Sequence, residues 1–263
     1  MPRREAGRAK RRARRVSALA AVMAVAVLVA RPAGQPAAEA TAPGSPIERF
    51  RATGADSLEA QDALILENAP AFAAEVDSAL AAPGFAHPEE RALLRRAADR
   101  YLSATGDSLL VWDVEFVSSR SEADRALWGR GVEADRDGFV LRAGGDHAAS
   151  ASAFRRAAGI YRQVGHLRRE AVAWGSCGVS AWTAGDLDGV ADAYANALEA
   201  RVRLGDPVLV GRTLNGIGSL HFRRGDYAAA REYYERARGV REALPSRSDL
   251  GTTLAYLANV DYK

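Results

Sequence analysis

The sequence predicts an all-α protein, an α-solenoid built from antiparallel helix pairs. The first observation is residues 213–238, where Leu214, Ile217 and His221 recur at the three- and four-residue spacing of one helical face. Gly225-Asp226 then interrupts the pattern, because glycine readily ends a helix and aspartate caps the next one. Helical spacing resumes at Tyr227, Ala230, Tyr234 and Ala237. Since both helices are apolar on two sides, the pair needs neighbours to bury its surface.

The second observation is a sequence period of about 40 residues, a length typical of helical repeats. One period earlier the same chemistry recurs at Trp174, Cys177, Gly178, Ala181, Gly185, Asp186, Leu187, Val190, Tyr194 and Ala197. A weaker copy lies two periods earlier, at Ala134, Gly138, Leu141, Gly145, Asp146, His147, Ser150, Phe154 and Ala157. A further copy begins at Leu254, Leu257 and Ala258. The intervening turns keep the same spacing, at Gly165-His166, Gly205-Asp206 and Leu244-Pro245-Ser246. A constant period of this length indicates a stacked solenoid.

The pattern from Leu214 to Ala237 resembles the tetratricopeptide repeat, in a form of about 40 residues where about 34 is common. Trp174 supplies the tryptophan typical of that family. The resemblance is strong over residues 167–263 and weaker over 134–166. It implies a right-handed solenoid whose concave groove is lined by the first helix of each pair. The sequence departs from the family pattern at Asp137 and Asp261, so the first and last repeats are the least regular.

The first 46 residues fall into three segments. Residues 1–15 are strongly basic and residues 16–30 form an uncharged apolar run, which is the layout of an export signal. As a helix this run extends about 22 Å, less than a hydrocarbon core of about 30 Å, which favours a cleaved signal peptide. The alternatives are an uncleaved membrane anchor and a basic cytoplasmic tail. Both membrane-directed interpretations place the repeats outside the cytoplasm, periplasmic, secreted or anchored. Residues 31–46, rich in proline, alanine and glycine, predict a linker.

Residues 47–120 are predicted to form a helical N-terminal cap or degenerate repeats. Two short helices are expected between residues 56 and 80, separated at Pro70, and a third from Pro88 to about residue 104. A turn at Gly106 precedes a further helical pattern. The repeat spacing slips by one residue here, which favours the cap. Ser121 opens a helix that runs to about residue 143, and the repeats are assigned to residues 121–263.

Composition and charge exclude several classes of function. The pI of about 9.2 comes from residues 1–31, which carry nine basic residues and one acidic residue; without them the net charge of +3 becomes about −5. The remainder is therefore poorly suited to bind a polyanion such as nucleic acid. Cys177 is the only cysteine, which leaves no disulfide within one chain, and its repeat position predicts a buried thiol. Abundant arginine and alanine with little lysine suggest a bacterial genome of high GC content.

We find no residue set that predicts catalysis, a cofactor or a metal. The HExxH, GxxxxGK[ST] and strand-associated GxGxxG motifs are absent. His87 lies near Glu89 and Glu90 but has no second histidine within helical reach. His221 occupies an interior repeat position and is predicted to pack there. We therefore expect no enzyme activity, cofactor or metal in these residues.

The groove positions of the family, mapped onto these repeats, give the candidate site. They are Arg142, Trp182, Arg212, Asn215, Ser219, Phe222, Arg223, Asn259 and Tyr262. Trp182, Phe222 and Tyr262 follow one another at the repeat interval and predict a row of aromatic rings. The neighbouring arginines are suited to pair with carboxylates of a bound peptide. The alternative is that the aromatic side chains only pack between adjacent repeats.

The resemblance implies a noncatalytic scaffold that binds a peptide or protein segment in its groove. We expect no nucleic-acid partner, and membrane contact only through an uncleaved N-terminal segment. The alternative is the regulatory or recognition region of a longer enzyme, because exported bacterial proteins of this type continue in some families into a caspase-like CHAT peptidase domain. Self-association through the repeats is a third hypothesis. The last copy stops within a repeat, so we expect a fragment of a longer protein.

Overall fold

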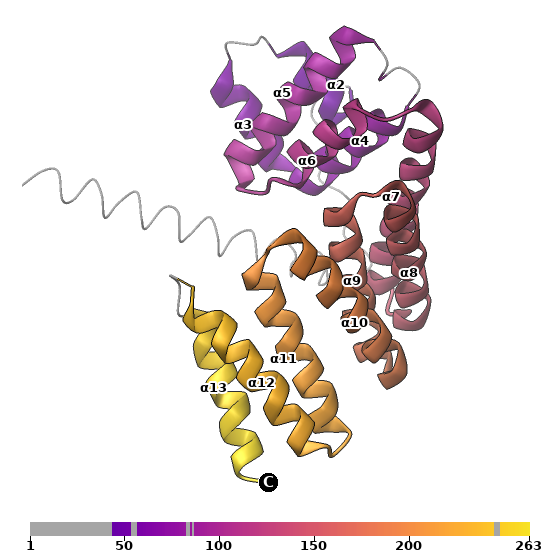
Figure 1. Ribbon diagram of the computed structural model, residues 1–263. Coiled ribbons are helices and arrows are strands. Elements are labelled where there is room, and N and C mark those ends of the chain that lie inside the picture. Colours follow the sequence, from indigo (N-terminus) through magenta and orange to yellow (C-terminus); the bar gives the residue numbers. More distant parts are fainter. Residues whose placement is uncertain (1–43, 54–56, 83–84, 86, 245–247) are drawn as a thin grey trace, which may run out of the picture. The chain divides into compact units, whose positions relative to one another are not determined.

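The computed structural model of the 263-residue chain describes residues 44–53, 57–82, 85, 87–244 and 248–263. The predicted export signal and residues 31–43 of the predicted linker lie outside the described residues, as does Pro245-Ser246 of the predicted turn. Within the described part of the chain the regular elements are twelve helices and no strand, so the all-α prediction is confirmed (Figure 1). None of the helices described there combines the length and apolar character needed to cross a membrane.

The chain divides into two compact units, Met1–Glu122 and Ala123–Lys263. The described helices of the first unit are α2 (Pro46–Ala52), α3 (Leu58–Glu67), α4 (Ala69–Ala81), α5 (Pro88–Thr105) and α6 (Leu109–Ser118). Pro70 lies in the first turn of α4, where its missing N–H removes no helical hydrogen bond. Gly106 ends α5 with a φ of 79°. The expected helices on either side of both positions are therefore present.

Aromatic rings fill much of the core of the first unit. Phe50 and Phe72 are both fully buried, and their rings meet edge to face with centroids 5.4 Å apart. Tyr101 of α5 stacks on Phe72 at 6.2 Å. Such contacts join α2, α4 and α5, and α2 with its seven residues is too short to be stable alone in water.

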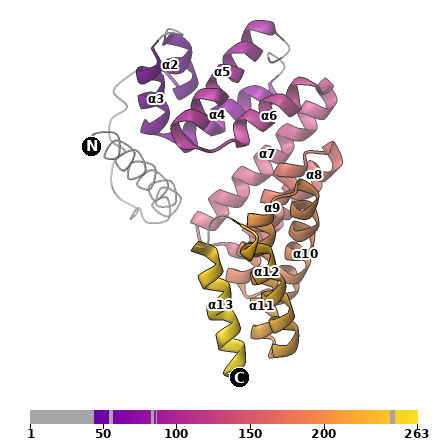
Figure 2. The same ribbon diagram turned by 60° about the vertical axis from the view of Figure 1, so that its left-hand side comes forward.

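Seven of the described helices belong to the second unit. They are α7 (Glu122–Ala143), α8 (His147–Val164), α9 (Leu167–Ala184), α10 (Leu187–Leu204), α11 (Pro207–Arg223), α12 (Tyr227–Glu242) and α13 (Ser248–Asp261). Helices consecutive in the sequence pack against one another, and α11, α12 and α13 lie side by side in both views (Figures 1 and 2).

The turns of the second unit recur at half the sequence period, because each repeat contains two helices. A glycine with φ between 66° and 85° follows each of the first five helices, at Gly145, Gly165, Gly185, Gly205 and Gly225. The next residue caps the following helix by accepting a hydrogen bond from the backbone amide three residues ahead; these caps are Asp146, His166, Asp186, Asp206 and Asp226. Because each turn is this short, successive helices run antiparallel.

Glycine–aromatic contacts hold each helix pair together. The ring of Tyr194 in α10 lies so close to Gly178 in α9 that a Cβ there would be 2.3 Å from a ring carbon. Tyr234 meets Gly218 in the same way, one period later in the sequence, at 2.6 Å. Phe154 meets Gly138 at 2.8 Å, one period earlier. Contacts that recur with the sequence period fit a helical solenoid.

Candidate functional site

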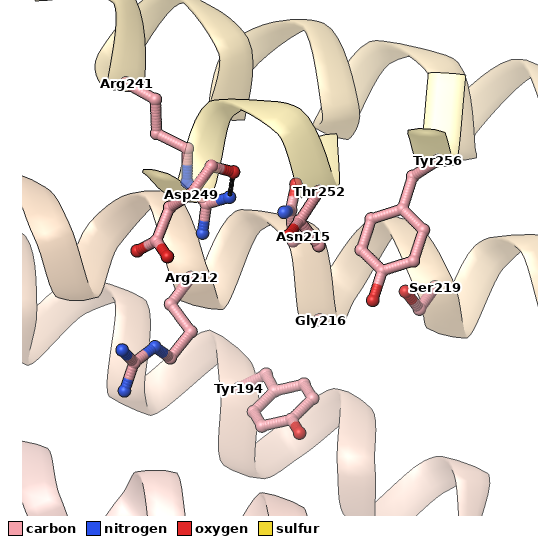
Figure 3. A pocket seen from close by; sticks show the side chains of 9 residues that line it. All are labelled: Tyr194, Arg212, Asn215, Gly216, Ser219, Arg241, Asp249, Thr252 and Tyr256. Carbon is pink, nitrogen blue, oxygen red and sulfur yellow. Dashed lines mark hydrogen bonds between the residues drawn. The ribbon is translucent and has the colours of Figure 1, made fainter. Parts of the chain in front are cut away.

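Two adjoining cavities open beside α11, and both use residues from α10, α11 and α13. The larger has a volume of about 310 Å³ and is lined by Tyr194, Arg212, Asn215, Gly216, Ser219, Arg241, Asp249, Thr252 and Tyr256 (Figure 3). The smaller has a volume of about 270 Å³ and is lined by Val179, Trp182, Thr183, Tyr194, Gly216, Ser219 and Tyr256. Because four residues line both cavities, we call them together the twin pocket.

Gly216 lines both cavities and lets the Tyr194 ring approach α11 closely. The residues one period before and after Gly216 are Ser176 and Tyr256. Tyr194 projects from α10 and Tyr256 from α13, with Gly216 and Ser219 of α11 between them (Figure 3). A Cβ at Gly216 would stand 2.8 Å from the Tyr194 ring, so a larger residue would displace that ring.

Two buried arginines connect neighbouring helices near the larger cavity through hydrogen bonds. Arg201 donates hydrogen bonds to Thr213 Oγ1 and to the Ala171 carbonyl oxygen. One period later, Arg241 donates to Thr253 Oγ1 at 2.8 Å and to the Asp249 carbonyl oxygen. Each arginine thus reaches a threonine further along the chain, on the first helix of the next pair.

Burial lowers the pKa of both buried arginines. For Arg201, the positive charge of Arg212 lowers the pKa further. For Arg241, the Asp249 carboxylate partly opposes the effect of burial, while Arg212 adds to it. Arg212 thus adds a third positive charge near the buried guanidinium groups of Arg201 and Arg241.

Asn215 forms part of the polar floor of the larger cavity. Its side chain is 5% exposed, and its Nδ2 donates to Thr253 Oγ1 at 3.0 Å. The same hydroxyl oxygen accepts from Arg241, so one threonine of α13 connects α11 with α12. The Asn215 Oδ1 atom has no hydrogen-bond partner among the described residues.

The smaller cavity is the more apolar of the two. Val179 is 48% exposed and lies one helical turn from Trp182. The indole of Trp182 also packs against the buried residues Ala181, Val190 and Leu220. The Arg223 guanidinium lies over the indole, 5.2 Å from the ring centroid, so it covers one face of this cavity wall.

The structure brings together five of the nine residues predicted for the groove. Arg212, Asn215 and Ser219 line the twin pocket with Trp182, and Arg223 stacks on Trp182. The predicted row of aromatic rings is divided. Phe222 packs against the buried cluster of Ala230, Tyr234, Leu257 and Val260. Tyr262, 89% exposed, lines neither cavity, and neither does the exposed Asn259.

Arg142 is held by the fold and lines neither cavity. Its guanidinium donates to Ser180 Oγ at 3.0 Å and to the Ser176 carbonyl oxygen at 2.8 Å. It also lies 4.7 Å from the centroid of the Phe154 ring. Burial lowers the pKa of Arg142. Its position in the repeat is that of a groove residue, but its side chain ties α7 to α8 and α9.

Sequence reasoning missed Tyr194, Tyr256, Arg241 and Asp249 as lining residues. Tyr194 and Arg241 belong to second helices of their pairs, which the family mapping did not consider. The available signal was the recurrence of Arg201 at Arg241, one period later, together with that of Thr213 at Thr253. An arginine and a threonine that both recur one period later indicate two side chains that contact each other.

The described residues contain no group of three histidine, cysteine, aspartate or glutamate side chains placed to hold a metal ion. His221 packs as predicted, stacked on Tyr233 at 5.3 Å with its Nδ1 atom 3.4 Å from Asp226. Cys177 is fully buried, and burial raises the pKa of its thiol.

Comparisons with known proteins give a distant likeness. No protein-family model matches the chain, and no curated protein matches it. Among solved structures, it is similar to "Crystal structure of BtubC (BKLC) from P. vanneervenii", with 19% sequence identity and a TM-score of 0.47. The match covers 83% of this chain and 84% of that chain.

Proposed function

We propose that this protein is a noncatalytic scaffold that binds a peptide or protein segment on the face formed by α9, α11 and α13. In this proposal residues 121–263 form a right-handed solenoid of tetratricopeptide type. The support for that family is the constant sequence period, the recurring glycine–aromatic contacts and the helix pairs joined by capped glycine turns.

The twin pocket is the observation that carries the proposal. Pockets for whole small molecules range over about 300–1,000 Å³, so each cavity is at or below the lower end. Two small connected cavities with different linings suit successive side chains of a longer partner. Trp182, Tyr194 and Tyr256 provide the rigid aromatic surface that such partners use as anchors.

A matched pair of substitutions tests this proposal. The whole chain is immobilised and used to select from a displayed library of random peptides, and the affinity of a recovered peptide is measured in solution. Val179→Glu places a carboxylate in the smaller cavity and should weaken binding by about tenfold or more, about 1.4 kcal/mol.

The control is Val202→Glu on α10, because Val202 is similarly exposed, at 59% against 48%, and lines neither cavity. It should leave the affinity unchanged. The proposal fails if no peptide is enriched over the bare support, or if both substitutions weaken binding equally.

A further inference from the structure

Five uncharged residues on α13 and just after it form a stripe that is exposed to solvent. They are Gly251, Leu254, Ala255, Ala258 and Tyr262. Their spacing of three or four residues places them on one side of the helix. The buried residues Leu257 and Val260 lie on the other side and pack with Tyr234 of α12. None of the five exposed residues lines the twin pocket, so they form a separate surface, which we call the α13 stripe.

The other repeats show that a helix covers this surface elsewhere in the second unit. Buried residues occupy the positions of Gly251, Leu254, Ala255 and Ala258 one and two periods earlier: Gly211, Leu214, Asn215 and Gly218 in α11, and Ala171, Trp174, Gly175 and Gly178 in α9. The second helix of each pair covers them, with Tyr234 of α12 against Gly218 and Tyr194 of α10 against Gly178. The α13 stripe is therefore placed like a helix-binding surface, although it is exposed among the described residues.

Ala258 determines which kind of helix fits the α13 stripe. The ring of Tyr234 lies so close to Gly218 that a Cβ there would be 2.6 Å from a ring carbon. Ala258 has this Cβ, so a helix that presents a tyrosine at this point, as α12 does, would overlap with it. Gly251 differs, because no atom of the described residues beyond its chain neighbours lies within 4 Å of a Cβ placed on it. The occupant therefore needs a non-aromatic residue beside Ala258 and has room for a ring at Gly251.

A second copy of α13 meets both requirements. In an antiparallel pair with a two-fold axis near Tyr256, Leu254 of one copy lies beside Ala258 of the other, since each is two residues from the axis. Tyr262 and Gly251 are six and five residues from the axis, so the ring of Tyr262, which is 89% exposed, reaches Gly251 of the other copy. This arrangement repeats between two chains the glycine–aromatic contact that joins the helices of each pair.

We infer that two copies of this chain associate through their α13 stripes, with the two helices antiparallel. Association moves Leu254 and Tyr262 of each copy out of water, and this burial of apolar surface drives it. One helix of 14 residues from each copy gives a small interface, so the dimer should be weak and reversible, with a dissociation constant on the order of 10 μM. This inference concerns a surface outside the twin pocket and does not depend on the proposed function.

Analytical ultracentrifugation of the whole chain measures this association. The weight-average mass should rise from near 28.0 kDa at a concentration of about 1 μM towards twice that value at about 100 μM. Ala258→Arg places a charge at the middle of the stripe, on an exposed helical position that tolerates arginine, and should keep the mass at one chain. The control is Ala195→Arg, the same change at an exposed position within α10, which should associate as the wild type does.

A mixing experiment tests the antiparallel arrangement. Leu254→Glu should also remain a single chain, because its two carboxylates would approach each other across the axis. Mixed with Ala258→Arg it should form a dimer again, since the arginine of one chain then lies beside the glutamate of the other. A dimer restored by mixing requires two folded variants, so misfolding cannot imitate this result.

Three results would overturn the inference. The first is a mass of one chain at every concentration, which would leave the α13 stripe to another segment of the chain or to a different protein. The second is association that persists in Ala258→Arg or disappears in Ala195→Arg. The third is a mixture of the two α13 variants that forms no dimer. None of these results bears on peptide binding in the twin pocket, so the proposed function stands or falls separately.

Discussion

Tyr101 shows how the fold controls the ionisation of a single residue. Its ring stacks on Phe72 in the core of the first unit, and the side chain is 8% exposed. Burial raises the pKa of Tyr101 from 10.0 to about 12, and the negative charges of Asp107 and Asp77 act in the same direction. The phenolate is therefore disfavoured in the folded chain and not in the unfolded chain.

We predict that Tyr101 makes the first unit less stable at alkaline pH. The unfolded tyrosine loses its proton near pH 10 and the folded one near pH 12, so stability is intact below the first value and falls between the two. The loss is at most about 2.7 kcal/mol. Urea unfolding of the wild type and of Tyr101→Phe across this range measures it, because phenylalanine keeps the ring and removes the ionisation. Parallel pH profiles would contradict the prediction.

At the scale of one helix, the residues that end and cap each helix could be predicted from the sequence, but the directions of the side chains could not. Glycine followed by aspartate defines the end of one helix and the start of the next through local backbone conformation and capping, which neighbouring residues decide. Arg142 lies in the last turn of α7, and Phe222 lies near the end of α11. The direction of the Arg142 side chain depends on Phe154 and Ser180, and that of Phe222 on Leu257 and Val260, all of which lie on other helices.

Two glycines, one just before α12 and one within it, should respond in opposite ways to substitution. Gly225 has a φ of 79°, so Gly225→Val should destabilise the second unit by about 2 kcal/mol, since β-branched residues resist this conformation. Gly239 lies within the helix with open space around its Cα, so Gly239→Ala should stabilise it by about 0.5–1 kcal/mol. Denaturant unfolding measures both. Equal effects of the two substitutions would show that the turn does not require glycine.

For the whole molecule, the sequence predicted the all-α class and the glycine turns of the second unit, but not the pocket beside α11. The constant period is visible in the sequence because each repeat buries its apolar surface against its neighbours with similar residues at the same positions. The twin pocket is lined by residues of several helices, among them Tyr194, Gly216 and Tyr256, and no periodic pattern in the sequence indicates that they meet. The first unit lacks a clear period, so only its individual helices were predictable.

Protection of backbone amides should be uneven along the second unit. In a solenoid each layer is stabilised by its nearest neighbours. Within the described chain α13 packs against α12 and α11 and leaves Leu254 46% exposed, while α9 lies between α8 and α10 and buries most of its side chains. Hydrogen exchange in α13 should therefore be at least about tenfold faster than in α9. Uniform protection would show that the unit opens only as a whole.

The bonds from Arg201 to Thr213 and from Arg241 to Thr253 make the second unit extensible by duplication. Residues 187–226 carry an arginine, Arg201, that donates to a threonine, Thr213, while the period before them has Tyr161 and Ala173 at the corresponding positions. A second copy of residues 187–226, inserted after Asp226, would bring one complete arginine–threonine bond and leave the existing bonds in register. The second unit could thus be lengthened by whole repeats, through gene recombination or by design, with the same arginine–threonine bond at the new junction.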